Sequence, residues 1–446
     1  MKVFLVLSEF PDPQGEAVEV VAFEVLRHLI TNDHEVVLQV IWRYPADEIE
    51  LLRREKNIEH IDQKKLEICS VLSTVDTRCD LYHRLRRFVV QRFVSIIFPE
   101  KLFPAAQLVS QIKERVLLTQ ADVILSVWSW EGLAATYDIS MVPKFMYYGN
   151  PDHKPERARL KHPDIFGIPT KTVWDKLRLR YSKFQNSRRK SAHIGMMNQC
   201  EVTANNSVLD AQFYASNGHP RSIYLQNMWP DIDKSGDGLP RVEHRKDIVK
   251  IIGSIGNLGA TGNTFGLYYL GKEVLPRLSK RLVGQDFEIH LLGKGAPSPV
   301  VAPYLSDERI KHRGWVDDIN EEIFSSHAFL IMTNSNEDFL VGNTRLLLAW
   351  ALGACVILHA NSALAMPEIE HEKNALLGNT PDEIVDCIIR VAGDEKLRYQ
   401  IGQGGYKTFM HYYRSDVVMP KMIGELENCV VSFGKWKQNN GNFEVG

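Results

Sequence analysis

Small and polar residues gather where two predicted strands end in the second half of the chain. They are Gly253, Ser254, Gly256, Asn257 and Gly259 at or just after the strand 248–256, and Gly293 and Lys294 at the end of the strand 287–295. Glycines at a strand-to-helix turn let backbone amides approach an anion, and the helix N-terminus adds about half a positive charge. The pattern predicts a site for a phosphate-like anion, with an ordinary flexible loop as the alternative. Its spacing is not G-x-G-x-x-G, so it does not support dinucleotide oxidoreduction.

An arginine is predicted to join this anion site. Gly342, Asn343 and Arg345 lie at the start of the helix predicted at 344–353. The helix dipole disfavours a cation in the first turn, so Arg345 makes sense there if it reaches an anion held by the glycine loop. Its planar fork of donors suits a phosphate. A plain surface arginine is the alternative.

The elements that must position these residues alternate between strands and helices. Further strands are predicted at 3–7, 36–42, 123–128, 144–148, 201–204, 222–225, 311–315, 328–333 and 355–360, with helices between most of them. This alternation predicts an α/β fold of two Rossmann-like, doubly wound domains that face each other across a cleft. Ligands of such sheets bind outside the carboxyl ends of the strands.

Length and composition set the domain organisation. A chain of 446 residues suits two domains, and the polar, Gly- and Pro-rich segment 235–246 reads as their linker. The expected parts are an N-terminal domain over 1–235, a C-terminal domain over 236–415, a helix over 416–432 that packs back on the first domain, and a polar tail over 433–446.

Charge and cysteine usage exclude several classes of protein. Lys and Arg number 53 against 55 Asp and Glu, which argues against a nucleic-acid partner. Six cysteines lie far apart without a C-x-x-C pair, which argues against a disulfide framework and a zinc site. No apolar run reaches the ~18 residues of a spanning helix, and the N-terminus does not resemble a signal peptide. We expect a cytoplasmic protein.

Several motifs occur in a fixed order along the second half. They are Gly253-Ser254, Asn263, Leu275-Pro276, Gly293-Lys294-Gly295, GWVDDI at 314–319, Gly342-x-x-Arg345 and Ala351–Gly353. In this order they resemble the C-terminal half of the GT-B glycosyltransferases, and more specifically the retaining family 4, the glycosyl-transferase group 1 proteins. Upstream, the segments 121–125, 143–153 and 222–231 follow the same family order.

The resemblance implies a donor site in the second domain. A nucleotide-diphosphate sugar would be the co-substrate, with no further cofactor and no metal. Arg345, helped by Lys294, would bind the diphosphate beside the loop 253–262, and the backbone of Trp315 and Val316 would meet the base. The implied reaction is sugar transfer, with retention, to a hydroxyl of a glycan or lipid-linked acceptor in surface polysaccharide or glycoconjugate synthesis.

The chain also departs from the family. The family's Glu-x7-Glu pair falls on Leu340 and Leu348, with Glu337 and Asp338 nearby as substitutes for the first glutamate. Three explanations stay open: a divergent subfamily, a changed nucleotide grip, or lost activity. A sugar-nucleotide epimerase of the same fold, or a catalytically silent partner of a glycan or another transferase, are therefore the alternative functions.

The first domain is expected to hold the acceptor. The family's catalytic histidine falls near Asn150, with His153 a few residues further. We predict catalytic roles for these two residues, and a solvated loop is the alternative for His153. Gly15 and Asp152 are placed on the acceptor side, where a plain turn glycine is the alternative for Gly15.

Two tryptophans follow the strand 123–128 in the first domain. Trp128 and Trp130 would stack on a sugar or fill the core, and a core position is favoured for Trp128. Strand alternation predicts that both point to the same face. We place Trp130 on the acceptor side with Gly15 and Asp152.

Two basic segments suggest a further partner. Between His153 and His193, twelve lysines and arginines face three acidic residues, and the segment 83–103 interleaves arginines with aromatic and aliphatic residues. Such segments suit a peripheral helix on an anionic membrane surface, here the inner face of the membrane. A solvated basic face over ordinary core residues is the alternative. No motif supports a nucleic-acid partner.

Overall fold

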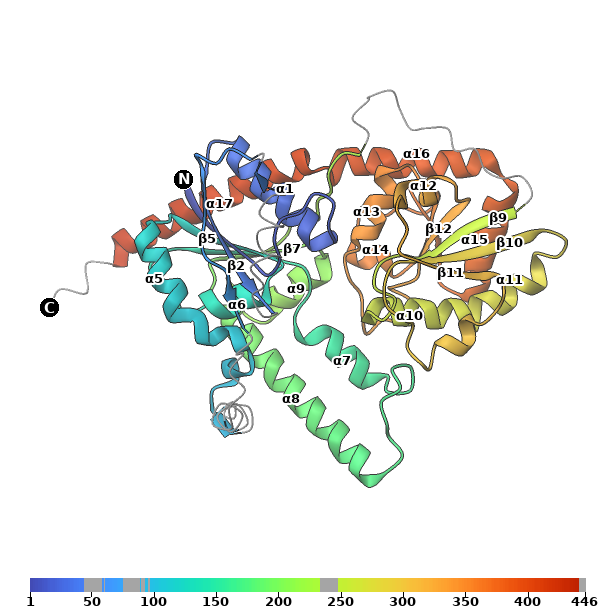
Figure 1. The fold of residues 1–446 in the computed structure, drawn as a ribbon, viewed down its shortest axis with the longest axis horizontal. Helices are drawn as coiled ribbons and strands as arrows, with labels where there is room; N and C mark the ends of the chain where they lie inside the picture. Colours follow the sequence, from blue (N-terminus) through green and yellow to red (C-terminus); the bar gives the residue numbers. More distant parts are fainter. Residues whose placement is uncertain are drawn as a thin grey trace. The chain divides into compact units, whose positions relative to one another are not determined.

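The computed structural model describes residues 1–43, 58–59, 61–74, 89, 93–94, 97–232 and 248–440. They form two compact units (Figure 1). The first unit contains Met1–His153, Ser187–Pro230 and the chain from Ser415, and the second contains Lys154–Asn186 and the chain from Asp231 to Arg414. The expected linker 235–246, most of 83–96, and 441–446 lie outside the described residues.

The first unit is built on a parallel sheet in the strand order β3-β2-β1-β5-β6-β7-β8, with β4 also paired to β2. Its strands are β1 (Lys2–Leu7), β2 (Glu35–Trp42), β3 (Leu66–Ile68), β4 (Leu72–Ser73), β5 (Val123–Val127), β6 (Lys144–Tyr148), β7 (Val202–Asn205) and β8 (Ser222–Tyr224). Its helices are α1 (Ala17–Thr31), η3 (Pro99–Leu102), η4 (Pro104–Leu108), α5 (Val109–Thr119), α6 (Trp130–Thr136), α9 (Val208–Ser216) and α17 (Ser415–Asn440), together with the end of α8 (Val173–Met197).

The second unit has a parallel sheet in the order β11-β10-β9-β12-β13-β14. Its strands are β9 (Ile248–Ser254), β10 (Asp286–Leu292), β11 (Ile310–Gly314), β12 (Ala328–Ile331), β13 (Val356–His359) and β14 (Leu376–Gly378). Its helices are α7 (His153–Lys161), α10 (Thr261–Tyr269), η5 (Leu270–Val274), α11 (Leu275–Arg281), η6 (Ala302–Leu305), α12 (Ile319–Phe324), α13 (Thr344–Ala351), α14 (Ser362–Ala365), α15 (Pro381–Gly393) and α16 (Glu395–Tyr412).

Both sheets are doubly wound, as the alternation of elements predicted. In the first, β1 lies between β2 and β5, and in the second, β9 lies between β10 and β12. The order of strand addition reverses at these two places, and such switch points are where ligands of open α/β sheets bind. Each unit therefore has one edge, at the carboxyl ends of its central strands, where a site is expected.

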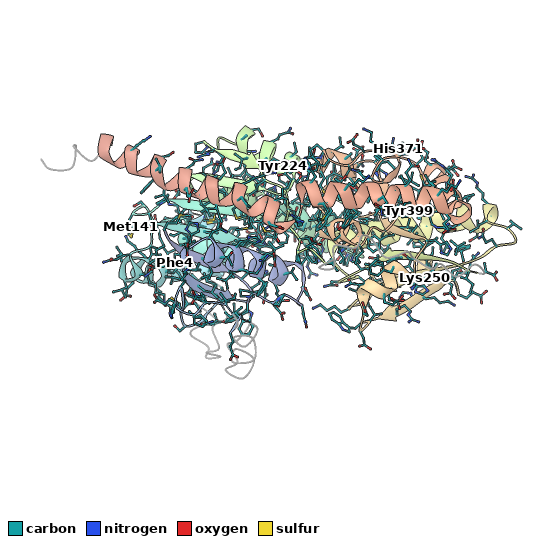
Figure 2. All side chains as sticks on the ribbon, turned by 90° about the horizontal axis from the view of Figure 1, so that it is seen from above. Phe4, Met141, Tyr224, Lys250, His371 and Tyr399 are labelled. Carbon is teal, nitrogen blue, oxygen red and sulfur yellow. The ribbon has the colours of Figure 1, made fainter. Side chains whose placement is uncertain are left out.

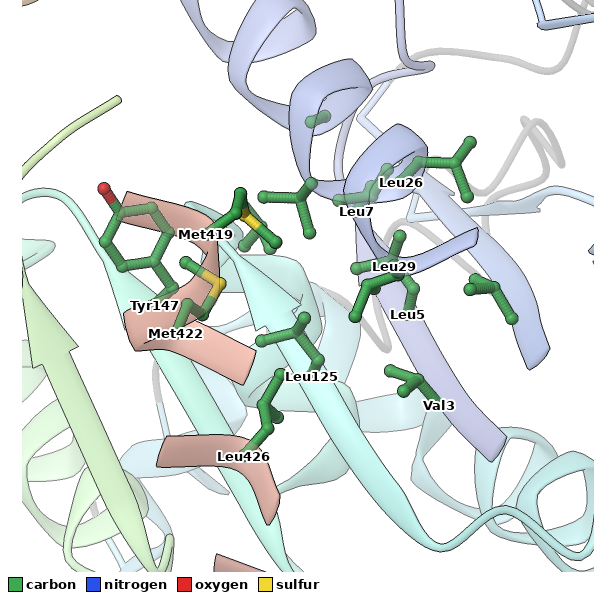
Figure 3. Packing of buried hydrophobic residues seen from close by; sticks show 14 of the residues in the cluster. Val3, Leu5, Leu7, Leu26, Leu29, Leu125, Tyr147, Met419, Met422 and Leu426 are labelled. Atoms are coloured by element: carbon green, nitrogen blue, oxygen red, sulfur yellow. The ribbon is translucent and has the colours of Figure 1, made fainter. Parts of the chain in front are cut away.

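Helices cover both faces of each sheet, which is why the strands read as continuous apolar runs. In the first unit, β1 sends Val3, Leu5 and Leu7 to one face and Phe4 to the other. Figure 3 shows the first of these faces, where Leu5 and Leu125 lie with Met419, Met422 and Leu426 of α17. In Figure 2, Phe4 marks β1 of the first unit and Lys250 marks β9 of the second.

Two parts of the chain differ from the sequence expectation. The segment 154–186 belongs to the second unit, because Ala158 and Ile165 pack in that unit's core. The C-terminal helix α17 packs in the first unit's core through residues such as Met422 and Leu426. It runs on to Asn440 rather than stopping at 432, so the start of the expected tail is helical.

Candidate functional site

The first turn of α13 is fixed to the end of β12 by Asn343. As the N-cap of α13, its side-chain oxygen accepts a hydrogen bond from the backbone amide of Arg345 at 3.2 Å. Its Nδ2 donates to the hydroxyl of Thr333, just after β12, at 2.7 Å. Asn343 was predicted to bind the donor, but these two bonds give its side chain a structural role that places Arg345.

The guanidinium of Arg345 lies against the loop that follows β9. Its Nη1 donates to Oδ1 of Asn263, whose Nδ2 in turn donates to the carbonyl oxygens of Asn257 at 2.7 Å and Ile255 at 3.3 Å. A Cβ added at Gly256 would lie 3.7 Å from Nη2 of Arg345. The glycine loop and the arginine, which are 89 positions apart in the chain, therefore meet at the switch point.

Arg345 is a desolvated cation. Burial lowers the pKa of its guanidinium to about 10, and none of the described carboxylates pairs with it. It remains protonated near pH 7. Arg345 is half-buried, and a partly desolvated charge without a counter-charge costs free energy, so an anionic ligand at this place would offset that cost.

Backbone passes close to backbone beside this arginine. Gly293 has φ of +114° and donates its amide to the carbonyl of Gly314 at 2.7 Å. A Cβ added at Gly293 would lie 2.2 Å from the carbonyl oxygen of Gly256, which itself has φ of +86°. Only glycine fits here without rearrangement. Gly253 has a different reason, because a Cβ there would lie 2.5 Å from the side chain of Ile289 inside the unit's core.

A small cavity joins several predicted donor-site residues. Its volume is about 10 Å³, enough for about one water. Gly253, Ser254 and Arg345 line it together with Asn263 and Thr333. The structure thus brings the end of β9, the end of β12 and the start of α13 to one point.

The remaining predicted donor-site residues lie around this point in different states. Asn257 and Gly259 make a local turn, in which the Gly259 amide donates to Oδ1 of Asn257 at 3.0 Å. Lys294 and Glu337 are exposed, Trp315 is 75% exposed, and Val316 and Gly342 are half-buried.

The positions of the missing glutamates are part of the packed interior. Leu340 and Leu348 are both buried. Asp338, considered as a substitute, is paired with two residues at the end of α7. Its oxygens lie 2.6 Å from Nζ of Lys161 and 2.7 Å from Nε2 of His162. Because these two contacts occupy both carboxylate oxygens, Asp338 is not a free hydrogen-bond acceptor for a ligand.

In the first unit, His153 is 2% exposed. Its ring lies 5.3 Å from the ring of Phe213 and 6.4 Å from that of His193. His193 shares a hydrogen bond of 2.6 Å with the hydroxyl of Tyr214, and burial lowers the pKa of His193 to about 3. The solvated-loop alternative for His153 is therefore wrong, because the residue packs in an aromatic cluster. Asn150 is half-buried in the turn that leads to it.

Asp152 and Trp130 line a common pocket of about 220 Å³. Asp152 is 5% exposed, and burial raises its pKa to about 6 against the opposing effect of Arg189 and Arg43. Three charged residues that the sequence analysis missed also line this pocket, namely Arg43, Glu131 and Arg189. Arg43 and Glu131 could have been found because each follows closely on the end of a predicted strand.

The two tryptophans lie on opposite faces of the first sheet. Trp128 packs with the cluster of Leu125 and Val127, whereas Trp130 packs with that of Ile124. The expectation of a shared face is wrong because β5 ends at Val127 and Trp128 turns the chain with φ of +46°. The favoured core position of Trp128 is confirmed as a half-buried contact with that first cluster.

Gly15 lies in the loop before α1. A Cβ there would lie 2.3 Å from the carboxylate of Glu19, which accepts a hydrogen bond from the amide of Glu16. This capping arrangement at the start of α1 gives a local reason for the glycine. Its acceptor-side role stays a prediction.

Comparison with known proteins finds a family similarity in the second unit. Residues 249–394 match the family model described as glycosyl transferases group 1. Over these residues the second unit is similar to the group 1 glycosyl transferases. The resemblance drawn from the order of motifs is confirmed, and the matched range contains the glycine loop and Arg345. A search of curated proteins gave no match for the chain.

Solved structures show that the whole chain has the GT-B fold. Anabaena Alr3699/HepE in complex with UDP and glucose is 12% identical with a TM-score of 0.57, over 95% of this chain and 99% of that one. Sucrose-phosphate synthase from Thermosynechococcus elongatus is 13% identical with a TM-score of 0.60, over 97% and 100%. A candidate UDP-N-acetylglucosamine 2-epimerase from Listeria monocytogenes is 12% identical with a TM-score of 0.50, over 95% and 94%.

Proposed function

We propose that the protein transfers a sugar, with retention, from a nucleotide-diphosphate sugar to a hydroxyl of a glycan or lipid-linked acceptor. Surface polysaccharide or glycoconjugate synthesis is the process that suits such an acceptor. The observation that carries the proposal is the half-buried guanidinium of Arg345, which meets the glycine loop and has no carboxylate partner among the described residues. The HepE structure, which holds UDP and glucose, supports this choice of donor.

The chemistry asks for positive charge where the diphosphate leaves. Arg345 would supply a full charge, and the amides around Gly256 and the first turn of α13 would supply dipoles. Because these groups are fixed by Asn263 and Asn343 before the ligand arrives, they need little reorganisation as charge develops. We propose that transfer proceeds in this way without a metal ion.

Nucleotide binding tests the proposal. UDP, GDP, ADP and dTDP, each with its common sugars, would be screened by thermal shift, and a ligand at 100 times its dissociation constant should add about 2.7 kcal/mol of stability. In Arg345→Ala we expect the affinity of the bound nucleotide to fall by about 10–100-fold, because a charge-assisted hydrogen bond is lost. Arg345→Lys should lose less.

Arg281→Ala is the matched control, since Arg281 lies on α11 in the same unit and pairs with Asp386 on the surface. We expect this variant to bind the nucleotide as the wild type does. Unchanged affinity in Arg345→Ala would remove the residue from the donor site and overturn the proposal.

Product analysis separates the alternatives. An epimerase of this fold would convert or release the nucleotide sugar without forming a second glycan product. A catalytically silent partner of a glycan or another transferase need not bind a nucleotide diphosphate at all. This alternative is supported by the leucines at 340 and 348, where the family has glutamates. Nucleotide binding together with a new glycosidic product would exclude both.

A peripheral position on the inner, cytoplasmic face of a membrane is the localisation we propose. Among the described residues, no helix combines the length and apolar character needed to cross a bilayer. The apolar residues exposed on α8 instead form a stripe, because their spacing of three and four residues places them on one side of a helix. They are Val173, Trp174, Leu177, Tyr181 and Phe184, from 41% to 79% exposed.

Basic residues flank this stripe. At ~100° per residue, Arg178 lies on one side of it and Arg180 and Lys176 lie on the other. An apolar stripe between cations suits anionic lipid headgroups over an acyl boundary. In the segment 83–103, of which only part is described, Phe93, Ile97 and Phe98 are also exposed.

Co-sedimentation with vesicles tests this localisation. We expect binding to vesicles that contain about 30% anionic lipid, weaker binding at high salt, and little binding to neutral vesicles. Leu177→Ser should weaken binding, whereas Leu118→Ser should not, since Leu118 is an exposed leucine on α5. Equal binding by both variants would contradict a role for α8.

A further inference from the structure

A pocket at the carboxyl edge of the first unit's sheet has a lining that the donor chemistry does not use. Its volume of about 220 Å³ is far above the ~10–15 Å³ that one water needs. Arg43 follows β2, Glu131 lies in the first turn of α6 after β5, and Asp152 follows β6. Strands that end at the same edge of a parallel sheet bring these residues together.

Two buried carboxyl groups in this pocket have oxygens without a hydrogen bond. Glu131 is 9% exposed, and its Oε1 lies 3.0 Å from Nε of Arg43, while its Oε2 has no hydrogen-bond partner among the described residues. Asp152 is 5% exposed, and its Oδ2 lies 3.8 Å from Nε of Arg189, too far for a hydrogen bond. Buried acceptors left in this state cost free energy, so a ligand that brings donors is favoured.

The two arginines also lie against aromatic rings that line the pocket. The guanidinium of Arg43 is 4.8 Å from the ring centre of Trp130, and that of Arg189 is 6.0 Å from the ring centre of Phe103. These cation–π contacts hold rings and guanidiniums side by side. The pocket therefore offers apolar ring surface, hydrogen-bond donors and hydrogen-bond acceptors to one occupant.

The balance of charge narrows the class of ligand. A phosphate would meet both guanidiniums but would also be repelled by the carboxylates of Glu131 and Asp152. A purely apolar ligand would leave all four charged groups unsatisfied. An uncharged sugar ring satisfies them, because its hydroxyls both donate to carboxylate oxygens and accept from guanidiniums, while its C–H face packs on Trp130.

We propose that this pocket binds an uncharged sugar residue of the acceptor. The word acceptor rests on the proposed transferase function, whereas the binding of a sugar rests on the pocket alone. Glu131 and Asp152 receive hydroxyl hydrogens, Arg43 and Arg189 donate to hydroxyl oxygens, and Trp130 carries the ring. The pocket thereby selects a neutral glycan end over a phosphorylated one.

Ligand-observed NMR on the full-length protein tests the proposal. The probes are the methyl glycosides of glucose, galactose, mannose and N-acetylglucosamine, with inorganic phosphate and glucose 6-phosphate as charged competitors. At least one neutral glycoside should bind, and Trp130→Ala, Asp152→Asn and Glu131→Gln should each weaken it by about tenfold or more. Tyr399→Ala, which removes an exposed aromatic ring from α16, should bind the glycoside normally.

Three outcomes would overturn the pocket proposal. They are no binding of any glycoside, binding that all three variants retain, and displacement of the glycoside by inorganic phosphate at equal concentration. Asp152→Asn and Glu131→Gln keep the shape of the side chains, and thermal unfolding identifies any variant that has failed to fold. In that case the remaining variants decide the result.

Nucleotide titrations on the same samples separate the two proposals. If a nucleotide binds and depends on Arg345 but no glycoside binds, the pocket proposal fails and the donor proposal stands. If a glycoside binds and depends on Trp130 and Asp152 but no nucleotide binds, the transferase function fails and the pocket remains a sugar site.

Discussion

The sheets of the two units share the order of six strands but present different chemistry at their carboxyl edges. At the switch point of the second unit, one guanidinium stands among amides and glycines without a described carboxylate partner. At the corresponding edge of the first unit, two carboxyl groups face two guanidiniums beside aromatic rings. The fold thus supplies the edge, and the few residues after each strand decide which charged and polar groups that edge presents to a ligand.

The backbone differs between the two edges as well. In the second unit the loops after β9 and β10 approach each other through Gly256 and Gly293, both with positive φ. In the first unit the chain turns after β5 through Trp128, a large residue with φ of +46°. At the edge of the second unit, the glycines expose backbone amides that can reach a ligand. The edge of the first unit presents side chains instead.

Placing a carboxylate near Arg345, at the sheet edge of the second unit, should have the largest effect on stability. Leu348 is buried on α13, one turn beyond Arg345, and Leu348→Glu restores the residue type that the family resemblance implies there. We expect the free energy of unfolding to fall by about 3–5 kcal/mol, because a charge is buried at a site packed for leucine. Urea unfolding measures this loss, and Leu348→Met controls for the change in shape.

A Leu348→Glu variant of normal stability with tighter nucleotide binding would contradict this prediction. It would show that the second unit can still use a glutamate at this position to bind a nucleotide, so that the difference in charge between the two sheet edges depends on one substitution. Nucleotide affinity should therefore be measured on the same preparation.

Adding a methyl group between the two glycine loops should have the next largest effect. In Gly293→Ala the Cβ would lie 2.2 Å from the carbonyl oxygen of Gly256 at φ of +114°, and we expect a loss of about 3 kcal/mol with weakened nucleotide binding. Gly284→Ala is matched in backbone, at φ of +80°, but has nothing within 4 Å. It should cost only about 1–2 kcal/mol, as denaturant unfolding would show.

Equal losses in the two glycine variants would contradict a close approach of the loops. The loss of stability would then come from backbone conformation alone. The sheet edge of the second unit would not depend on contact between the loops after β9 and β10. Sugar binding by the first unit should be the same in both variants.

The fold and the glycine loops at the edge of the second sheet could largely be predicted from the sequence, because they depend on local patterns. Continuous apolar runs followed by turns predict parallel strands, and glycines after β9 and β10 predict exposed amides. The meeting of Arg345 with that loop could be expected from the rule that carboxyl ends share an edge. What the guanidinium does there stays a prediction until a nucleotide is bound.

The polar pocket of the first unit could be predicted only in part. Trp130 and Asp152 were named, but the ion pair of Arg43 with Glu131 joins two strands of the sheet and leaves no local pattern. The same holds for 154–186, whose attachment to the second unit depends on tertiary contacts of Ala158 and Ile165. Strand alternation also failed for Trp128, since it cannot show where a strand stops and φ changes sign.

Replacing Asp152, one of the two carboxyl groups at the sheet edge of the first unit, should change the pH dependence of stability. Asp152 faces Arg43 and Arg189, and burial raises its pKa from 3.8 to about 6. The folded state therefore binds this proton more tightly than the unfolded state, and takes it up as pH falls from about 6 to about 4. In that window wild-type stability should rise, relative to Asp152→Asn, by about 2–3 kcal/mol.

Unfolding of both proteins at several pH values from 4 to 8 measures this difference. Glu131, whose pKa burial also raises, and Tyr148 and Tyr214 near Asp152 are present in both proteins, so their contributions largely cancel. A difference that does not vary with pH would mean that Asp152 is not desolvated, and the pocket would then be open to water.

Loss of the N-cap of α13, Asn343, should have the smallest effect on stability. It also tests whether Asn343 only positions Arg345 or contacts the ligand itself. Asn343→Ala removes the N-cap of α13 and the bond to Thr333, so the free energy of unfolding should fall by about 1–2 kcal/mol. Thr380→Ala removes the matched cap of α15 in the same unit and should cost about 1 kcal/mol. Nucleotide affinity should fall severalfold in Asn343→Ala, less than in Arg345→Ala because Asn263 still holds the guanidinium, and should not change in Thr380→Ala. If Asn343→Ala lost as much affinity as Arg345→Ala, the side-chain amide of Asn343 would itself contact the nucleotide. The sheet edge of the second unit would then bind the nucleotide with more than one side chain.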